Sequence, residues 1–163
     1  GPEYALLRPE FHRVKKTLRK RDGQIRRILV FFGGSDPTNE TKKALQAIKR
    51  LNRPDIAVDV VVGAANPHRE EIKEICREMP NTTYRCQIEN MAELMAAADL
   101  AIGAGGVTTW ERLYLELPTL AIAVAENQVE TLGAMSENGL VWYLGKWSEV
   151  VVDDIYFKII NLL

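Results

Sequence analysis

Three glycines stand within four positions, directly after a short apolar stretch: Gly103, Gly105 and Gly106. Because glycine has no side chain, the backbone N–H groups of this turn are open to close approach by a ligand. Either Thr108 or Thr109 can cap a helix that begins there, and the positive end of that helix points to the same place. The segment therefore predicts a site for an anion, and a phosphate or diphosphate is the natural ligand.

The glycine spacing is not that of the best-known nucleotide motifs. Gly103-x-Gly105 lacks the third glycine of the dinucleotide fingerprint, because Thr108 stands at that position, and no phosphate loop with a lysine occurs. Glycines after a strand can also be ordinary turn residues. Glu111 lies within the first turns of the expected helix, where its carboxylate can reach a ribose bound beside the phosphates. The alternative for Glu111 is a carboxylate that only stabilises the helix start.

Strands and helices alternate in the pattern that would position this turn. Apolar, β-rich stretches predict strands at 27–32, 57–62, 82–86, 100–102, 119–124 and 140–144. Helical spacing predicts helices at 9–20, 38–50, 66–79, 91–97, from the glycine turn to about 117, at 127–137 and from 148. The alternation indicates an α/β fold, a doubly wound, Rossmann-like parallel sheet of about six strands, with ligands at the carboxyl ends of the strands. A second glycine turn, at 33–36 and with Asp36 or Thr38 as a helix cap, falls on the same edge.

Composition indicates one globular domain with a core. The chain has 163 residues, of which 47% are hydrophobic and 26% charged. No apolar run approaches the length of a membrane span, and the N-terminus, Gly1-Pro2-Glu3, has neither a signal-peptide core nor an initiator Met. Cys76 and Cys86 lack the neighbours of a metal site, so we expect two buried free thiols in a reducing, cytoplasmic setting.

Basic residues gather at the N-terminus. Residues 1–27 hold nine of the 21 lysines and arginines against three acids, although the whole chain carries a net charge of −1. Phe11, Val14 and Leu18 would lie on one face of a helix at 9–20, which we interpret as a docking or linker helix with a solvated basic face. A nucleic-acid or anionic-surface patch is the alternative, but interleaved aromatic residues are missing. We therefore divide the chain into an interdomain linker with a basic helix at 1–26 and a nucleotide-sugar-binding domain at 27–163.

Three segments resemble one protein family. The segments 33–36, 103–112 and 125–128 are similar to the C-terminal domain of the SpsG and PseG family, which includes a UDP-sugar hydrolase. The likeness covers nearly the whole chain, and 1–9 is similar to the stretch where those proteins cross between domains. More distantly, the pattern is similar to MurG and other two-domain glycosyltransferases of the GT-B type, whose C-terminal half holds the nucleotide.

The resemblance implies a set of substrate-binding residues, which divide by the part of the ligand that they face. Those that face the diphosphate are Gly34, Ser35, Gly105, Gly106, Val107 and Thr108. The others are Asn90 and Met91 beside uracil, Glu111 on the ribose, and Asn127 with Gln128 on the sugar. Without the family, a helix cap followed by a surface residue is an equally good interpretation of the last pair.

The resemblance places the catalytic residue elsewhere. The hydrolase's catalytic His belongs to an N-terminal domain that this chain does not contain, and neither His12 nor His68 matches it, so we expect both to be exposed and structural. The implied partners are UDP or a UDP-sugar and the chain's own N-terminal domain, without metal, cofactor, nucleic acid or membrane. The implied function is hydrolysis of a UDP-sugar in surface or spore-coat polysaccharide synthesis of the nonulosonic acid type. The donor-binding half of a GT-B glycosyltransferase and a stand-alone nucleotide-binding module are the alternatives.

Overall fold

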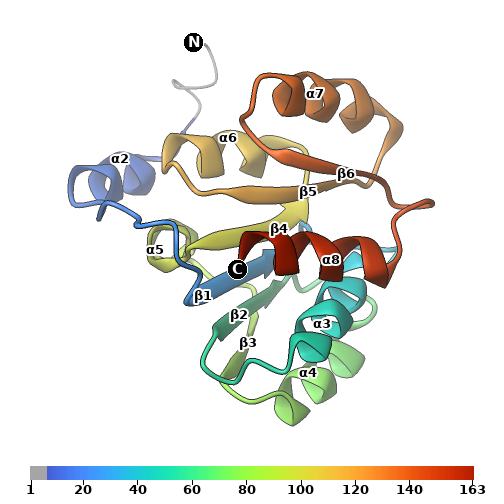
Figure 1. Ribbon diagram of the computed structural model, residues 1–163. Helices are drawn as coiled ribbons and strands as arrows, with labels where there is room; N and C mark the ends of the chain where they lie inside the picture. Colours follow the sequence, from blue (N-terminus) through green and yellow to red (C-terminus); the bar gives the residue numbers. More distant parts are fainter. Residues whose placement is uncertain (1–6) are drawn as a thin grey trace.

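The structure, a computed structural model, describes residues 7–163 apart from the side chain of Val107, so most of the expected domain crossing at 1–9 lies outside the described residues. The strands are β1 (Arg27–Phe31), β2 (Ala57–Val62), β3 (Thr82–Cys86), β4 (Leu100–Ala104), β5 (Thr119–Ala123) and β6 (Trp142–Lys146). The helices are α2 (Pro9–Lys16), α3 (Glu40–Leu51), α4 (Arg69–Glu78), α5 (Met91–Ala97), α6 (Val107–Tyr114), α7 (Glu126–Glu137) and α8 (Val152–Leu162). All six predicted strands are confirmed (Figure 1).

The strands form one parallel sheet in the order β3-β2-β1-β4-β5-β6. The chain therefore builds outward from β1 to β3, crosses back, and builds outward again from β4 to β6. This is the doubly wound order in which ligands lie at the point where the strand order reverses. Here that point falls between β1 and β4, where Phe31 is paired with Gly103.

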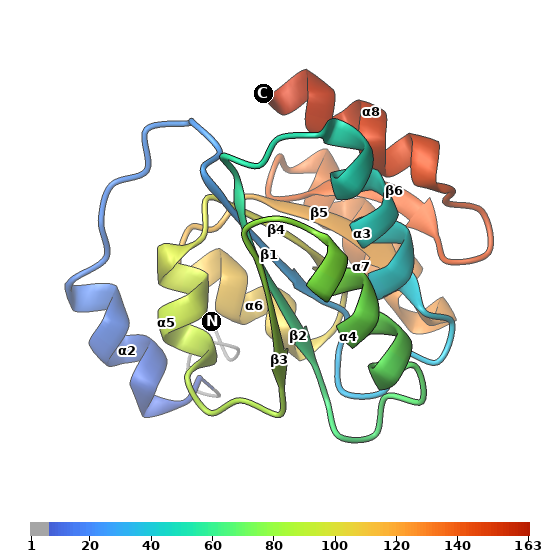
Figure 2. The ribbon, with the colours of Figure 1, turned by 90° about the horizontal axis from the view of Figure 1, so that it is seen from below.

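Helices cover both faces of the sheet, as Figures 1 and 2 show from two sides. Successive residues of β1 point to opposite faces: Ile28 and Val30 join the core under α3, α4 and α8, whereas Leu29 joins the core under α5. A third cluster lies between β5 and α7, around Leu132 and Met135. Two covered faces account for the continuous apolar runs of β1, β4 and β5. The predicted α/β fold is thereby confirmed.

The basic N-terminal segment packs onto the domain. Helix α2 lies against α5 and α6, with Phe11 fully buried between them, and it ends at Lys16 rather than at 20 as predicted. Beyond the helix the chain runs past the C-terminal ends of α5 and α6. There Arg21 donates hydrogen bonds of 2.8–3.0 Å to four main-chain carbonyls, those of Met95, Ala98, Leu115 and Glu116. These bonds satisfy carbonyls that a helix end leaves without partners.

Four smaller predictions on single side chains have mixed outcomes. Cys76 is buried and free as expected, and burial raises the pKa of its thiol to about 11. Cys86 is exposed rather than buried, because its edge strand β3 is only partly covered. His12 and His68 are half-buried rather than exposed, since His12 Nδ1 lies 3.0 Å from the Tyr114 hydroxyl and His68 Nε2 lies 3.0 Å from the Pro37 carbonyl.

Residues 7–163 hold neither a membrane-spanning helix nor a cluster of metal ligands. No helix there is both long enough and apolar enough to cross a membrane. No group of three or more His, Cys, Asp or Glu side chains in the same part of the chain has the arrangement of a metal site.

Candidate functional site

Two glycine turns meet where the strand order reverses. A Cβ atom built on Gly103 would lie 2.5 Å from the Phe31 carbonyl oxygen, and one on Gly63 would lie 2.6 Å from the Gly34 Cα. The ends of β1, β2 and β4 therefore approach one another at distances that only glycine permits. Gly33 and Gly106 have φ angles of 91° and 102°, which residues with a side chain rarely adopt. The turns expected from sequence to face an anion thus lie side by side.

Helix α6 begins at the second turn, but its cap differs from the prediction. The N-cap residue is Gly106, whereas Thr108 and Thr109 lie inside the first helical turn. Their hydroxyl groups accept hydrogen bonds from Arg112, at 3.3 and 3.2 Å. The threonines miss the cap position because the helix starts immediately after the last glycine, earlier than their preference for caps suggested. The N-cap residue makes no side-chain hydrogen bond to the helix start, and the Thr109 N–H donates to the Gly106 carbonyl at 3.0 Å. The backbone N–H groups at the start of α6 that come before Thr109 are therefore the ones that a ligand can use.

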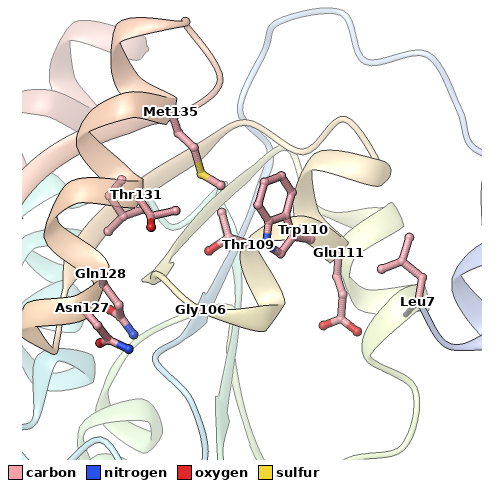
Figure 3. Close-up of a pocket in the computed structure, with 10 residues that line it drawn as sticks. Leu7, Gly106, Thr109, Trp110, Glu111, Asn127, Gln128, Thr131 and Met135 are labelled. Carbon is pink, nitrogen blue, oxygen red and sulfur yellow. The ribbon is translucent and has the colours of Figure 1, made fainter. Parts of the chain in front are cut away.

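A cavity of about 360 Å³ lies between α6 and α7 (Figure 3). Its lining residues are Leu7, Gly106, Thr109, Trp110, Glu111, Asn127, Gln128, Thr131, Leu132 and Met135. Four of them, Gly106, Glu111, Asn127 and Gln128, are predicted site residues. The sequence reasoning missed the apolar part of the cavity, although Thr131 and Met135 follow Asn127 at four-residue spacing and so share one face of α7.

Glu111 and Gln128 occupy defined positions in this cavity. Glu111 is 5% exposed, and its Oε2 accepts a hydrogen bond of 3.1 Å from Arg8 Nη2. Gln128 Oε1 accepts a hydrogen bond of 2.9 Å from the backbone N–H of Val124, at the end of β5. A Cβ atom on Gly105 would lie 3.2 Å from Gln128 Cβ, so this side chain packs directly behind the glycine turn. Asn127 is exposed inside α7, whose N-cap residue is Ala125, so the helix-cap alternative for Asn127 is wrong.

Most of the other predicted site residues, Gly34, Ser35, Asn90, Met91, Gly105 and Thr108, are not among the described residues that line this cavity. Gly34 and Ser35 are exposed just after β1, and Asn90 is exposed at the start of α5. The Met91 side chain is buried in the core beside Phe11, so only its backbone remains for a ligand. Gly105, within the second glycine turn, is buried against Gln128 and Leu132 of α7. Val107 begins α6, and its side chain is outside the described residues.

The acidic residues nearest the turns already have partners. Asp36 accepts three hydrogen bonds, two from the backbone N–H groups of Glu40 and Thr41 at 2.9 Å and one from the Thr41 hydroxyl at 2.6 Å. Its carboxylate thereby accepts the first backbone N–H groups of α3, although the N-cap residue is Asn39 and not Asp36 or Thr38 as predicted. Glu126 pairs with Lys146 at 3.1 Å on the surface. Neither carboxylate is placed as a general base beside the cavity.

Comparisons with known proteins agree with this architecture. Residues 28–138 match the glycosyltransferase family 28 C-terminal domain. The chain is 35% identical over 159 residues to the spore coat polysaccharide biosynthesis protein SpsG of Bacillus subtilis. That match covers 94% of this chain and 45% of SpsG. It is also 36% identical over 136 residues to an uncharacterized protein of Methanocaldococcus jannaschii. That match covers 80% of this chain and 28% of the relative. The chain thus spans less than half the length of either relative.

Solved structures share the fold at lower identity. MurG of Acinetobacter baumannii superposes with a TM-score of 0.67 at 18% identity, over 93% of this chain and 44% of that one. UDP-GlcNAc 2-epimerase from Neisseria meningitidis, solved with UDP-GlcNAc bound, superposes with a TM-score of 0.63 at 19% identity, over 94% of this chain and 42% of that one. Both superpositions cover nearly all of this chain and less than half of the solved protein.

Proposed function

The chain belongs to the glycosyltransferase family 28 C-terminal domain family, and on this premise we propose that it is the nucleotide-binding half of a two-domain enzyme that acts on a UDP-sugar. The observation that carries the proposal is the meeting of the Gly33–Gly34 and Gly103–Gly106 turns at the strand-order reversal, next to a cavity that contains Glu111. A diphosphate at the turns would leave a ribose within reach of α6, and the sugar would lie toward Asn127 and Gln128. Residues 1–26 would link this half to the other.

The contribution of this half to catalysis would be electrostatic. When the bond between sugar and UDP breaks, negative charge grows on the departing diphosphate. The backbone N–H groups of the Gly105–Gly106 turn and the N-terminus of α6 would stabilise that charge more than they stabilise the bound substrate. Such stabilisation lowers the barrier to departure because it acts on the transition state.

The group that activates water would come from the other half of the enzyme. Among the described acids near the turns, Asp36 accepts backbone N–H groups at the start of α3, Glu126 pairs with Lys146, and Glu111 is assigned to the ribose. A general base must lie within hydrogen-bond reach of the proton that it removes. In the proposed enzyme the base is therefore a residue, such as the His of the resembled hydrolases, that faces this domain across a cleft.

Hydrolysis is the reaction that we propose, in synthesis of a polysaccharide of the nonulosonic acid type, because the glycine turns and the 125–128 segment resemble a family that includes a UDP-sugar hydrolase. The likeness to the spore coat polysaccharide biosynthesis protein SpsG over 94% of the chain supports a place in surface or spore-coat polysaccharide synthesis. Transfer of the sugar to an acceptor is the second candidate, and the matched glycosyltransferase domain favours it. The two reactions need the same nucleotide site and differ in whether water or an acceptor enters from the opposite side.

Release of UDP tests the proposal. This chain and the full-length protein are each incubated with UDP-N-acetylglucosamine and other UDP-amino sugars, and free UDP is measured. We expect no release above background from the chain alone, because general-base help and the closed cleft are absent and the base alone is worth about 10²- to 10⁴-fold. The full-length protein should release UDP without an acceptor if it is a hydrolase, and only with one if it is a transferase. Release by the chain alone at the full-length rate, abolished by Asp36→Asn or Glu126→Gln, would contradict the division of labour.

A further inference from the structure

One buried cation lies directly behind the glycine turn of the candidate site. Arg112, in the second turn of α6, is only 2% exposed. Its guanidinium donates hydrogen bonds to three neutral oxygens, the Ala104 carbonyl at 2.5 Å and the hydroxyls of Thr108 and Thr109 at 3.3 and 3.2 Å. A Cβ atom on Gly103 would lie 2.8 Å from Arg112 Nη1, so the glycine at the end of β4 makes room for the guanidinium.

This cation is incompletely satisfied. Within the part of the chain that the structure describes, the buried Nε of Arg112 has no hydrogen-bond partner. The neighbouring carboxylate of Glu111 accepts its hydrogen bond from Arg8 instead. Burial lowers the pKa of Arg112 to about 10, although Glu111 opposes the shift, so the group is still protonated at neutral pH. A protonated guanidinium held by neutral oxygens is unfavourable in a protein interior unless an anion comes near.

We propose that Arg112 is the positioning residue of the anion site, and that its charge is balanced when a ligand bearing phosphate groups binds at the Gly105–Gly106 turn. It holds the Ala104 carbonyl from behind, which fixes the turn so that backbone N–H groups face the ligand. Its charge acts through a region from which water is excluded, so attraction to the phosphates is stronger than that of an exposed side chain. This inference rests on the proposed function and deepens it, since it makes the charge of the diphosphate the main source of selectivity.

The test compares three ligands that differ in charge. Uridine carries no phosphate, pyrophosphate carries no nucleoside, and UDP carries both. Affinities are measured by NMR titration of this chain and of the variants Arg112→Met and Arg112→Lys. Arg13→Met, which removes an exposed guanidinium from α2 by the same substitution, is the matched control.

The charge of Arg112 should appear as a difference between ligands. We expect Arg112→Met to weaken pyrophosphate and UDP by about tenfold or more, while uridine changes by less than about twofold. Arg112→Lys, which keeps the positive charge, should recover most of the pyrophosphate affinity. Arg13→Met should leave all three affinities unchanged, because an exposed charge is screened by salt.

Two results would overturn the inference while leaving the nucleotide site in place. One is an Arg112→Met protein that binds pyrophosphate as tightly as the unaltered chain. The other is an equal loss of uridine and pyrophosphate in both variants, which would make Arg112 a structural support only. If the unaltered chain binds neither UDP nor pyrophosphate, the proposed function itself fails.

A measurement on the unaltered chain decides the matter if Arg112→Met does not fold. The ¹⁵Nε resonance of Arg112 is followed while pyrophosphate and then uridine are added. We expect the resonance to move with pyrophosphate and to stay in place with uridine. A resonance that stays in place while backbone amides at 103–107 respond to pyrophosphate would overturn the inference.

Discussion

Arg8 Nη2 donates a hydrogen bond of 3.1 Å to Oε2 of Glu111, across 103 positions of the sequence. The Glu111 carboxylate is buried, and the Arg8 side chain is about half exposed. A ribose that binds this carboxylate, as we propose, would either share it with Arg8 or displace Arg8 toward the solvent. Because an exposed arginine loses little when its partner is taken, the ion pair holds Glu111 in place without closing the site.

Replacing Glu111 should therefore weaken binding of the nucleoside part of UDP and leave binding of its phosphates nearly unchanged. We expect Glu111→Gln to weaken UDP by about 1.5 to 3 kcal/mol, the range for a hydrogen bond to a charged group, and to leave pyrophosphate nearly unchanged. Isothermal titration with both ligands checks the difference. The control is Arg8→Met, which frees the carboxylate and should leave UDP binding the same or slightly tighter. Equal losses of UDP and pyrophosphate in Glu111→Gln would remove the ribose role.

Gly34 tests whether a glycine turn serves the ligand or only the fold. A Cβ atom on Gly34 would meet nothing within 4 Å, so Gly34→Ala should change the free energy of unfolding by less than about 0.5 kcal/mol. The added methyl group would still stand between the backbone and a phosphate, and we expect UDP to bind about tenfold more weakly, or ~1.4 kcal/mol. Gly133→Ala in α7, where a Cβ also meets nothing, is the matched control and should leave UDP affinity unchanged. Unchanged UDP binding in Gly34→Ala would exclude this turn from the site.

The fold was predictable to the extent that its signals are local. Continuous apolar runs marked β1, β4 and β5, and the oxygen-rich side chain of Asp36 marked the start of α3, because burial and capping depend on neighbours in sequence. Helix ends were less well placed. The early end of α2 at Lys16 follows from contacts of the next residues with helices about 80 to 100 positions away.

The site was predictable in its backbone and not in its side chains. The glycines and Glu111 stand within one short segment, so their spacing carried the prediction. The Arg8 partner of Glu111 comes from the other end of the chain, and no local pattern reports it. The burial of Arg112 also escaped notice, since an arginine in an amphipathic helix ordinarily reaches solvent.

Arg21 tests whether the N-terminal segment belongs to the domain's own stability. We expect Arg21→Ala to lower the free energy of unfolding by about 1.5 to 3 kcal/mol, because it leaves carbonyls at the ends of two helices without their charged donor. Urea unfolding followed by circular dichroism measures the loss. The neighbouring Lys20→Ala, at an exposed position, should change stability by less than about 0.5 kcal/mol. A loss no larger in Arg21→Ala than in Lys20→Ala would show that this segment is only a linker.

Asp99 binds the same N-terminal segment through its carboxylate, so the strength of this attachment depends on pH. Burial alone would raise the pKa of the Asp99 carboxyl group. Hydrogen bonds from the Arg19 guanidinium at 2.7 Å, and from the backbone N–H groups of Arg26 and Arg27 at 2.8 and 2.9 Å, outweigh burial and lower that pKa below its ordinary value. A carboxylate whose folded pKa is lowered stabilises the fold above the unfolded pKa, and the stabilisation is lost as the pH falls through the folded value.

Asp99→Asn should accordingly destabilise the chain at neutral pH and matter less in acid. We expect a loss of about 1.5 to 3 kcal/mol near pH 7. The loss should shrink between neutral and acid pH, as the pH falls through the folded pKa and the carboxyl group of the unaltered chain becomes protonated as well. Urea midpoints of both proteins across this range measure the difference. A difference that stays constant from neutral to acid pH would show that shape, rather than the charge of Asp99, holds the segment.

If a uridine nucleotide binds where the strand order reverses, as we propose, a titration of this chain with UDP followed by ¹H–¹⁵N correlation spectra will locate it there. The resonances of 33–36, 90–91 and 103–111 should then move together and saturate. The basic segment at 13–27 should remain where it is. Shifts confined to that basic segment, or absent from both glycine turns, would show that the nucleotide does not bind where the strand order reverses.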